Sequence, residues 1–420
     1  VAPWAIVDSP EAAEAAVARV GLPLLVKAAG GGGGRGIRRV DHADEVAAAF
    51  VAARDEAARS FRSDGVMLER LVGKARHIEV QVLGDGEGGV VTLGLRDCSL
   101  QRRHQKVIEE AQAPAMSEAT QRRFLGAAHR LCAAAKYRSA GTVEFLYDAD
   151  RDEAYFLEVN TRLQVEHPVT EAVFGLDLVR AQIDLARGRP LPAVAEPRGW
   201  AVEARLCAED PQHGFAPAPG RIARFVPPSG PGLRLDAGFA EGDAISPDFD
   251  PLVAKLIAWG PDRPTALARL AKGLEQTRLV IEGGTTNLAW LRDLLDEPAF
   301  RAGQPDIGLV DRLIPEAPPG AWVAAVAAAI DRFLADGDGA EGTDRHRVEA
   351  GETLTVYRTG PARFRLVAEA GTLDVGRRVL SESEVELTVG AERLRVERAP
   401  GDDTYVVEGV SHRVAAATGG

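Results

Sequence analysis

The chain has 420 residues, of which 45% are hydrophobic and 27% charged, a composition typical of a globular protein with several domains. Its formal net charge of -12 argues against nucleic-acid binding through bulk electrostatics, and no apolar run reaches the roughly 18 residues that a membrane-spanning helix needs. The three cysteines are isolated, which excludes a disulfide framework and fits a reducing compartment, so a cytoplasmic location is expected. Neither a nucleic-acid nor a membrane partner is expected from the charge and hydropathy.

Hydrophobic periodicity predicts helices and strands in alternation over the first two thirds of the chain. Helices are expected over 10–20, 42–60, 118–137, 171–188 and 263–278. Strands are expected over 24–28, 67–71, 77–96 and 141–160, and as short segments within 200–259. The proline-rich stretch 190–198 indicates a linker or surface loop.

The last hundred residues follow a different pattern. An alanine-rich helix is expected over 322–335, and a polar, glycine-rich hinge follows over 336–342. Apolar and polar residues then alternate almost throughout 346–415. This alternation predicts a small antiparallel β module.

Five consecutive glycines, Gly30 to Gly34, follow the strand predicted over 24–28. Such a run costs backbone entropy, which is reasonable where backbone N–H groups must approach a polyphosphate closely. Lys27 at the end of the strand supplies a cation, although no Gly-Lys-Ser/Thr follows to make a P-loop. A flexible linker is the alternative. The preceding strand favours a phosphate-covering loop that includes Gly32, Gly33 and Gly34.

Residues 141–160 predict a β-hairpin with acidic residues on both strands. A register symmetric about residue 151 gives three opposed pairs: Glu144 with Glu158, Thr142 with Asn160, and Leu146 with Phe156. Directly opposed carboxylates destabilise a sheet unless a proton or a cation lies between them. Oxygen ligands from Glu144, Glu158 and Asn160 suit Mg²⁺ or Mn²⁺ better than zinc. A solvated hairpin edge with scattered acids is the alternative.

The segment after the hairpin carries a second set of candidate residues. Arg162 and Gln164 are expected on one side of an extended segment, where they could bracket a small planar anion through forked hydrogen bonds. Glu166, expected on the same side, could act as a base on that anion. A polar loop with structural roles is the alternative, and His167 is expected to be structural.

The stretch Arg96–Glu110 gathers basic residues in an otherwise acidic chain. This local excess of positive charge predicts an anion site, with a solvated basic turn as the alternative. Cys98 within the stretch is expected to be a small buried hydrophobe and not a nucleophile.

At these four segments the chain resembles the ATP-grasp biotin carboxylases, which carboxylate biotin in acetyl-, propionyl- and other acyl-CoA carboxylases. The resemblance runs from about residue 15 to about residue 312 and rests on the segments Lys27–Gly36, Arg96–Glu110, Glu158–Pro168 and Glu203–Pro211. It implies an α/β fold with an ATP-grasp lid subdomain (1–71), an ATP-grasp large subdomain (72–197), a biotin carboxylase C-terminal domain (198–315) and a helix plus β-rich connector or interaction module (320–420). It further implies that an N-terminal Rossmann-like domain is missing and that the chain is a fragment of a multi-domain protein.

The resemblance implies a role for each candidate residue. Lys27 and the glycine loop would hold the ATP phosphates, and the adenosine pocket would be lined by Glu69, His77, Gln101, His104 and Leu146. Magnesium or manganese ions would be held by Glu144, Glu158 and Asn160. Bicarbonate would be bound by Lys106, Arg162, Gln164 and the backbone of Val165, and deprotonated by Glu166. Arg205 would stabilise the enolate form of biotin at its ureido oxygen.

The implied activity is an ATP-dependent ligase reaction that carboxylates biotin through carboxyphosphate. Met67 and Met116 are the only methionines and neither precedes a lysine, so the Ala-Met-Lys-Met biotin attachment motif is absent. Biotin is therefore expected on a carrier domain or another chain, with a carboxyltransferase as second partner and a homo-oligomeric intact protein. The alternative is a truncated, non-catalytic fragment that binds nucleotide or docks in such a complex.

Overall fold

The computed structural model describes residues 1–28, 37–61, 65–313, 320–335, 344–347, 353–368, 371–399, 404–407 and 410–414. The chain forms two compact units: the first is Val1–Val202 with Ala302–Leu313, and the second is Glu203–Arg301 with Ile314–Gly420. Gly32, Gly33 and Gly34 and the predicted hinge 336–342 lie outside the described residues. No helix within the described ranges is long and apolar enough to cross a membrane.

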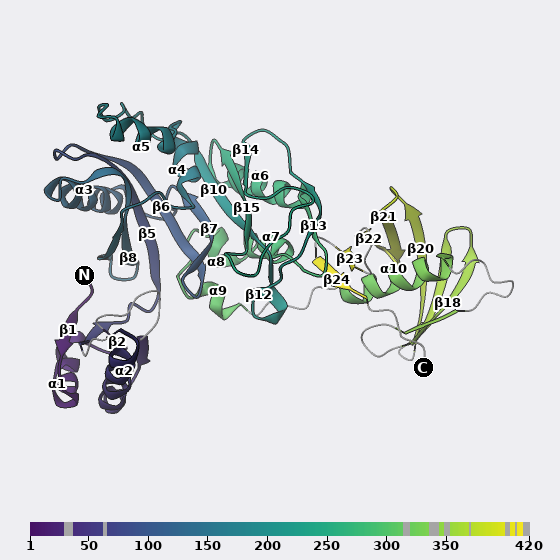
Figure 1. Cartoon of the computed structure of the whole chain (residues 1–420), viewed down its shortest axis with the longest axis horizontal. Helices are drawn as coiled ribbons and strands as arrows, with labels where there is room; N and C mark the ends of the chain where they lie inside the picture. Colours follow the sequence, from purple (N-terminus) through teal and green to yellow (C-terminus); the bar gives the residue numbers. More distant parts are fainter. Residues whose placement is uncertain are drawn as a thin grey trace. The chain divides into compact units, whose positions relative to one another are not determined.

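The first unit begins with a small four-stranded sheet in the order β1-β4-β2-β3, which carries two helices (Figure 1). Its elements are β1 (Trp4–Val7), α1 (Pro10–Val20), β2 (Leu24–Ala28), β3 (Ile37–Val40), the 3₁₀ turn η1 (Ala43–Glu45), α2 (Val46–Phe61) and β4 (Val66–Arg70). Helix α1 begins as predicted because the Ser9 side chain accepts a hydrogen bond from the Ala12 amide at 3.1 Å. The apolar faces of the helices and sheet share one core, which includes Phe50 and Leu68.

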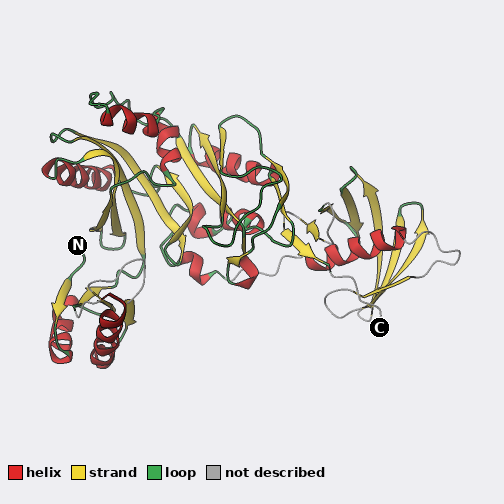
Figure 2. Ribbon diagram, viewed as in Figure 1, coloured by secondary structure: helices red, strands yellow, loops and turns green. Residues whose placement is uncertain are grey.

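A larger sheet includes, in the first unit, the neighbouring strands β7-β6-β5-β8-β9. Figure 2 draws its strands as yellow arrows. Its elements are β5 (Ala75–Asp85), β6 (Val90–Arg102), β7 (Gln105–Ala111), α3 (Glu118–Ala134), β8 (Arg138–Asp148) and β9 (Glu153–Asn160), and α9 (Leu309–Arg312) contacts β6. Strand β5 is buried along almost its whole length, and its residues Ile78, Val80 and Val82 share a core with α3. Because side chains alternate along a strand, the polar residues between them face the opposite side of the sheet.

The helix predicted over 171–188 is wrong as a single element. The chain forms α4 (His167–Phe174) and α5 (Leu178–Ala186) instead. Gly175 ends α4 with a left-handed φ of 65°, a conformation that glycine adopts without strain, and the Asp177 side chain caps the start of α5. Helix α4 begins directly after the polar segment 161–166.

Up to residue 301 the second unit contains antiparallel strand pairs with helices. Strand β10 (Trp200–Cys207) leads into it from the first unit. The remaining elements up to residue 301 are β11 (Glu209–Asp210), the 3₁₀ turn η2 (Pro211–His213), β12 (Ala216–Pro217), β13 (Ile222–Val226), β14 (Leu233–Ala237), β15 (Leu252–Gly260), α6 (Arg263–Gln276), β16 (Arg278–Ile281), α7 (Leu288–Leu295) and α8 (Pro298–Arg301). Strand β14 pairs with β15, β13 pairs with β16, and α6 packs on β15.

The C-terminal part of the second unit is an antiparallel sheet in which β17 to β24 follow one another in chain order. Its elements are α10 (Gly320–Ala335), β17 (Asp344–Arg347), β18 (Thr353–Gly360), β19 (Arg363–Ala368), β20 (Gly371–Val379), β21 (Glu384–Val389), β22 (Glu392–Arg398), β23 (Thr404–Val407) and β24 (Val410–Arg413). Figure 1 shows α10 lying across this sheet, where Ile330 and Phe333 share a core with Val356 and Leu387. The predicted α/β class, alanine-rich helix and β module are thus confirmed.

Candidate active site

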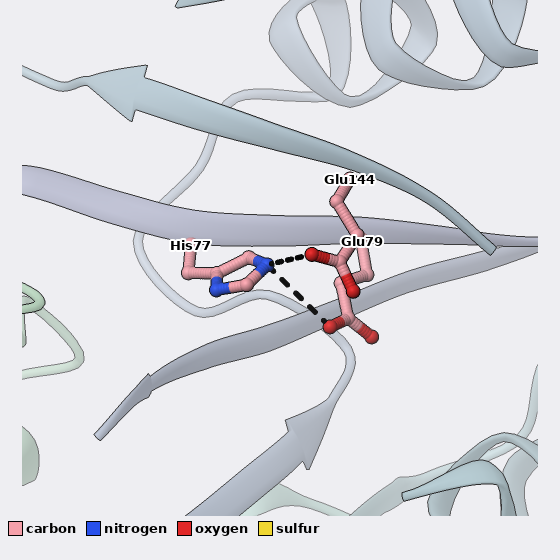
Figure 3. Close-up of side chains that lie close together, drawn as sticks. All are labelled: His77, Glu79 and Glu144. Carbon is pink, nitrogen blue, oxygen red and sulfur yellow. Dashed lines mark hydrogen bonds and ion pairs between the residues drawn. The ribbon is translucent and has the colours of Figure 1, made fainter. Parts of the chain in front are cut away.

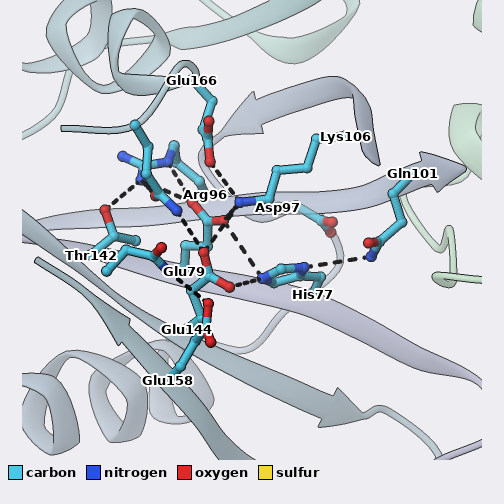
Figure 4. Close-up of polar contacts among 12 residues, drawn as sticks. His77, Glu79, Arg96, Asp97, Gln101, Lys106, Thr142, Glu144, Glu158 and Glu166 are labelled. Atoms are coloured by element: carbon cyan, nitrogen blue, oxygen red, sulfur yellow. Dashed lines mark hydrogen bonds and ion pairs between the residues drawn. The ribbon is translucent and has the colours of Figure 1, made fainter. Parts of the chain in front are cut away.

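One lysine in the first unit bridges three carboxylates. Lys106 on β7 donates to Glu79 on β5, to the Glu166 carboxylate at 2.6 Å and to the Glu144 carboxylate on β8 at 3.3 Å (Figure 4). The Lys106 side chain is only 12% exposed, and the three glutamates are buried. Side chains from two strands and from the segment before α4 therefore converge on one ammonium group. We call Lys106, Glu79, Glu144 and Glu166 the carboxylate cluster.

Arg96 on β6 supplies a second buried cation. Its Nε lies 2.9 Å from the Glu79 carboxylate and one terminal nitrogen donates to the Gln164 side-chain oxygen at 3.0 Å. Gln164 in turn donates from Nε2 to the Glu144 carboxylate at 2.6 Å. Arg96 and Lys106 thus contact the same buried Glu79, which keeps its charge because both neighbours are cations.

The surroundings of Glu144, Glu79 and Lys106 favour the charged forms of these three groups. Burial works against the charge of Glu144, but its hydrogen bond with His77 and the nearby Lys106 outweigh burial and lower the pKa of the Glu144 carboxyl to about 2. Burial likewise opposes ionisation of Glu79, yet Lys106 and Arg96 lower its pKa below the ordinary value. Although burial disfavours a charged lysine, the neighbouring carboxylates raise the pKa of Lys106. These groups are therefore charged at neutral pH.

His77 joins the cluster from the same strand as Glu79. Its Nε2 lies 2.9 Å from the Glu144 carboxylate and 3.6 Å from the Glu79 carboxylate (Figure 3). The Gln101 side-chain nitrogen is 3.5 Å from the other ring nitrogen, and Leu146 stands directly opposite His77 across β5 and β8. Three residues predicted for an adenosine pocket, His77, Gln101 and Leu146, are thus brought together next to the cluster.

The hairpin register is confirmed at its acidic end. Glu144 pairs with Glu158, and Thr142 pairs with Asn160. The predicted pair of Leu146 with Phe156 is wrong, because the register shifts after Glu144 and sets Phe156 opposite Phe145. The extra residue on β9 is a bulge, which a symmetric count from the turn does not anticipate.

The residues present fit a hard divalent cation. Glu144 is buried and ionised, Glu158 opposite it is exposed, and the Asn160 side chain donates to Glu158 at 3.1 Å. The donors predicted for the ion are therefore oxygens of two carboxylates and one amide on paired strands, which is the chemistry that Mg²⁺ prefers. Zinc and other soft metals favour nitrogen and sulfur ligands.

The segment after the hairpin is not extended as predicted. It turns at 165–166 into α4, so that Gln164 and Glu166 are buried against the cluster while the Arg162 side chain is exposed and donates to the Leu163 carbonyl at 3.3 Å. The prediction that Arg162 shares their side is therefore wrong for this structure. Val165 lies half-buried within the turn, and the ring of His167 contacts the Gln164 carbonyl at 2.7 Å, in keeping with a structural role.

The predicted basic cluster over Arg96–Glu110 divides into two parts. Arg96 and Lys106 enter the buried network, whereas His104 lies exposed beside Arg103 in the turn between β6 and β7. Both turn residues have positive φ, as a two-residue hairpin turn requires. Cys98 is buried, and burial raises the pKa of its thiol well above the ordinary value, in agreement with the expected hydrophobic role.

Other candidate residues lie outside the cluster. Lys27 on β2 forms an ion pair of 2.9 Å with Glu69 on β4, so the two residues predicted for the nucleotide meet within the small sheet. In the second unit, the backbone carbonyl of Arg205 on β10 accepts a hydrogen bond from the Asn287 side chain at 2.9 Å. The role predicted for each of these residues remains a prediction.

Sequence reasoning gives Glu79 no place in the site, and it gives Arg96 one only as a member of the basic stretch Arg96–Glu110. A signal was present for Glu79: polar His77, Glu79 and Gln81 alternate with the apolar residues at 78, 80 and 82. Such a row on a buried strand indicates a polar site on one face of the sheet. For Arg96 the only signal in the sequence is its position in the basic stretch Arg96–Glu110.

Comparisons with known proteins establish the family of the chain. Residues 2–194 match the family model described as "Carbamoyl-phosphate synthase L chain, ATP binding domain", and residues 203–312 match "Biotin carboxylase C-terminal domain". A biotin carboxylase of Nostoc is 43% identical over 70% of this chain and 66% of its own length, and one of Pseudomonas aeruginosa is 44% identical over 73% and 68%. The chain therefore spans about two thirds of the curated relatives it matches.

A solved structure is similar over the same part of the chain. It is the biotin carboxylase domain of Hydrogenobacter thermophilus 2-oxoglutarate carboxylase in complex with MgADP, ADP and bicarbonate, with a TM-score of 0.68, 37% identity, and coverage of 74% of this chain and 69% of that one. The sheet, its helices and the matching models define an ATP-grasp enzyme fold. The chain belongs to the biotin carboxylase family.

Proposed function

We propose that the protein carboxylates biotin on a carrier domain, using ATP and bicarbonate, through carboxyphosphate. The observation that carries this proposal is the contact of Lys106 with Glu166 beside the Gln164 amide. A cation, a carboxylate and an amide N–H group in one buried place can bind a small oxyanion and remove its proton. The related Hydrogenobacter domain, solved with MgADP and bicarbonate, supports this choice of ligands.

Bicarbonate is a weak nucleophile near neutral pH and needs a base. Glu166 is the proposed base, because its carboxylate lies in the site with Lys106 at 2.6 Å. Lys106 and the Nε2 of Gln164 are the proposed ligands of the anion, together with the Val165 backbone. Arg162, exposed in this structure, would have to swing its side chain toward the anion to complete the set.

Glu144, Glu158 and Asn160 are the proposed ligands of magnesium or manganese. When bound, the metal would neutralise charge on the ATP phosphates during transfer of the γ-phosphoryl group. Among the chain's own groups, Lys27 and the glycine loop with Gly32, Gly33 and Gly34 are proposed to hold those phosphates. The proposed adenosine pocket consists of Glu69, His77, Gln101, His104 and Leu146.

Arg205 is proposed to stabilise the negative charge that develops on the biotin ureido oxygen, the same principle as an oxyanion hole. Biotin is proposed to arrive on a carrier domain, and the carboxyl group to pass to a carboxyltransferase of an acyl-CoA carboxylase. Homo-oligomerisation of the intact protein is proposed from its family. A cytoplasmic location is proposed as well, supported by three buried cysteines that form no disulfide with one another.

The test is the formation of ADP by the full-length protein with bicarbonate and biotin supplied or withheld. ADP formation that depends on both is expected, and Glu166→Gln should lower it at least about 100-fold because the base is lost. The matched control is Glu171→Gln, a glutamate in α4 that accepts from the Leu178 amide at 2.7 Å. Turnover with an amino-acid acceptor and no need for bicarbonate would contradict the proposal and indicate another carboxylate–amine ligase.

A further inference from the structure

Arg96 is the most connected side chain of the site. It is 0% exposed, and its guanidinium makes five hydrogen bonds, one for each of its N–H groups. The acceptors are Glu79, Gln81, Thr142, Gln164 and Thr170, at distances of 2.6–3.0 Å. A saturated, planar guanidinium has no freedom to rotate, so it presents a fixed pattern of donors to its neighbours.

The Gln164 side chain is oriented by charged groups at both ends of its amide. Arg96 donates to the amide oxygen at 3.0 Å, while the amide nitrogen donates to Glu144 at 2.6 Å. A half-turn of the amide would set donor against donor at Arg96 and acceptor against acceptor at Glu144. In a buried network both mismatches are costly, because water cannot replace the lost partners.

The two ends differ once an anion is bound. A bicarbonate oxygen would accept from the Gln164 amide nitrogen, either in place of Glu144 or through the second N–H group of the amide. Arg96, at the other end of the amide, would keep its hydrogen bond in both cases. Without Arg96 the Gln164 amide can turn its oxygen toward the anion. Two acceptor oxygens then face each other, and the repulsion between them weakens anion binding.

We propose that Arg96 is a positioning residue that holds the Gln164 amide with its nitrogen facing the carboxylate cluster and so supplies the bicarbonate site with a hydrogen-bond donor. This inference rests on the proposed function and adds to it a residue that sets the affinity for the anion. Arg96 acts through Gln164 and does not touch the substrate itself.

The test is a double-mutant cycle in the full-length protein, with bicarbonate-dependent ADP formation as the readout. Arg96→Lys keeps the positive charge beside Glu79 but cannot reach all five acceptors. We expect it to raise the KM for bicarbonate about tenfold and to leave the KM for ATP within about twofold. In a Gln164→Met background, where no amide needs orienting, Arg96→Lys should change the bicarbonate KM by no more than about twofold.

A matched control separates positioning from general loosening. Arg76 on β5 is also buried and lies 3.0 Å from the Asp97 carboxylate. Arg76→Lys should leave the bicarbonate KM within about twofold. The inference is overturned if Arg96→Lys raises the bicarbonate KM equally with and without the Gln164 amide, or raises both KM values alike.

Two further outcomes are decisive. If thermal unfolding shows that Arg96→Lys does not fold, Gln164→Glu is compared with Gln164→Met. The glutamate gives Arg96 an acceptor but replaces the donor with a carboxylate, so a bicarbonate KM at least about tenfold above that of Gln164→Met is expected, and an equal one overturns the inference. ADP formation by the wild type that ignores bicarbonate contradicts the proposed function itself and this inference with it.

Discussion

Glu144 and Glu158 stand directly opposite each other on β8 and β9, yet one carboxylate is buried among donors and the other is exposed. Glu144 contacts His77 and Gln164 in addition to Lys106, whereas Glu158 contacts Asn160. Both carboxylates are proposed to bind the same metal ion, but only Glu144 also takes part in the buried hydrogen-bond network that stabilises the fold.

Replacing each glutamate by glutamine should distinguish its effect on metal binding from its effect on stability. Glu158→Gln should weaken magnesium-dependent nucleotide binding at least about tenfold and change the free energy of unfolding by less than about 0.5 kcal/mol, because the side chain is exposed. Glu144→Gln should weaken it similarly and also cost about 1–3 kcal/mol, because buried donors lose a charged acceptor. Magnesium titrations and urea unfolding provide both measurements. Equal stability losses for the two variants would contradict the assignment.

Removal of Lys106 should destabilise the protein strongly. Lys106→Met leaves three buried carboxylates without their shared cation, which we expect to lower the free energy of unfolding by about 3–5 kcal/mol and to abolish ADP formation. Lys272→Met removes an exposed pair with Glu275 at 2.9 Å and should cost less than about 1 kcal/mol. Urea unfolding of both variants checks the difference, and comparable losses would show that the cluster is not held by Lys106.

The pKa of Glu144 predicts a loss of stability in acid. Its folded-state pKa of about 2 lies below the ordinary value of 4.5, so its contribution is complete above about pH 4.5 and disappears as the pH falls toward 2. The contribution lost over this window is on the order of 3 kcal/mol. Thermal unfolding between pH 6 and pH 2 should therefore decline less steeply for Glu144→Gln than for the wild type. If the unfolding temperatures of the two proteins fell in parallel with pH, the neighbours of Glu144 would not lower the pKa of its carboxyl group.

Arg205 should separate two partial reactions. Arg205→Ser is expected to lower biotin carboxylation at least about 100-fold while slow bicarbonate-dependent ATP cleavage continues, because the arginine is needed only when charge forms on biotin. Asn287→Asp is the companion variant, since the Asn287 side chain holds the Arg205 backbone at 2.9 Å. A similar loss of both reactions in Arg205→Ser, with a lowered unfolding temperature, would assign Arg205 to the fold.

The sequence predicts the hairpin well because the pairing of two adjacent strands depends mainly on local alternation. The pair of Glu144 with Glu158 follows from a count that is symmetric about residue 151. Next to the turn the strands pair one residue out of this register, so that Leu146 faces Tyr155, and the bulge on β9 restores the predicted pairing at Glu144. Arg162 was misplaced for a related reason. A turn at 165–166 ends the extended geometry on which its expected direction depended.

The contacts among distant strands could not be counted in this way. Glu144 meets Glu79 and Lys106 because β5 pairs with β8, a strand that follows only after β6, β7 and α3, and this pairing depends on tertiary packing and not on spacing along the chain. The resemblance located Lys106 but not its partner Glu79. The buried ion network is therefore the part of the site that the sequence alone could not predict.

The C-terminal sheet and the sheet of the active site differ in how their strands find each other. Every strand from β17 to β24 pairs with its neighbour in the chain, so each new pair closes only a short loop. Strand β5 instead pairs with β8, after β6, β7 and α3 have intervened. Assembly of this second sheet is the slower event, because long loops must close before their contacts stabilise anything. The carboxylate cluster, whose members come from β5, β7, β8 and the segment before α4, consequently forms only in a chain that has completed its long-range pairing.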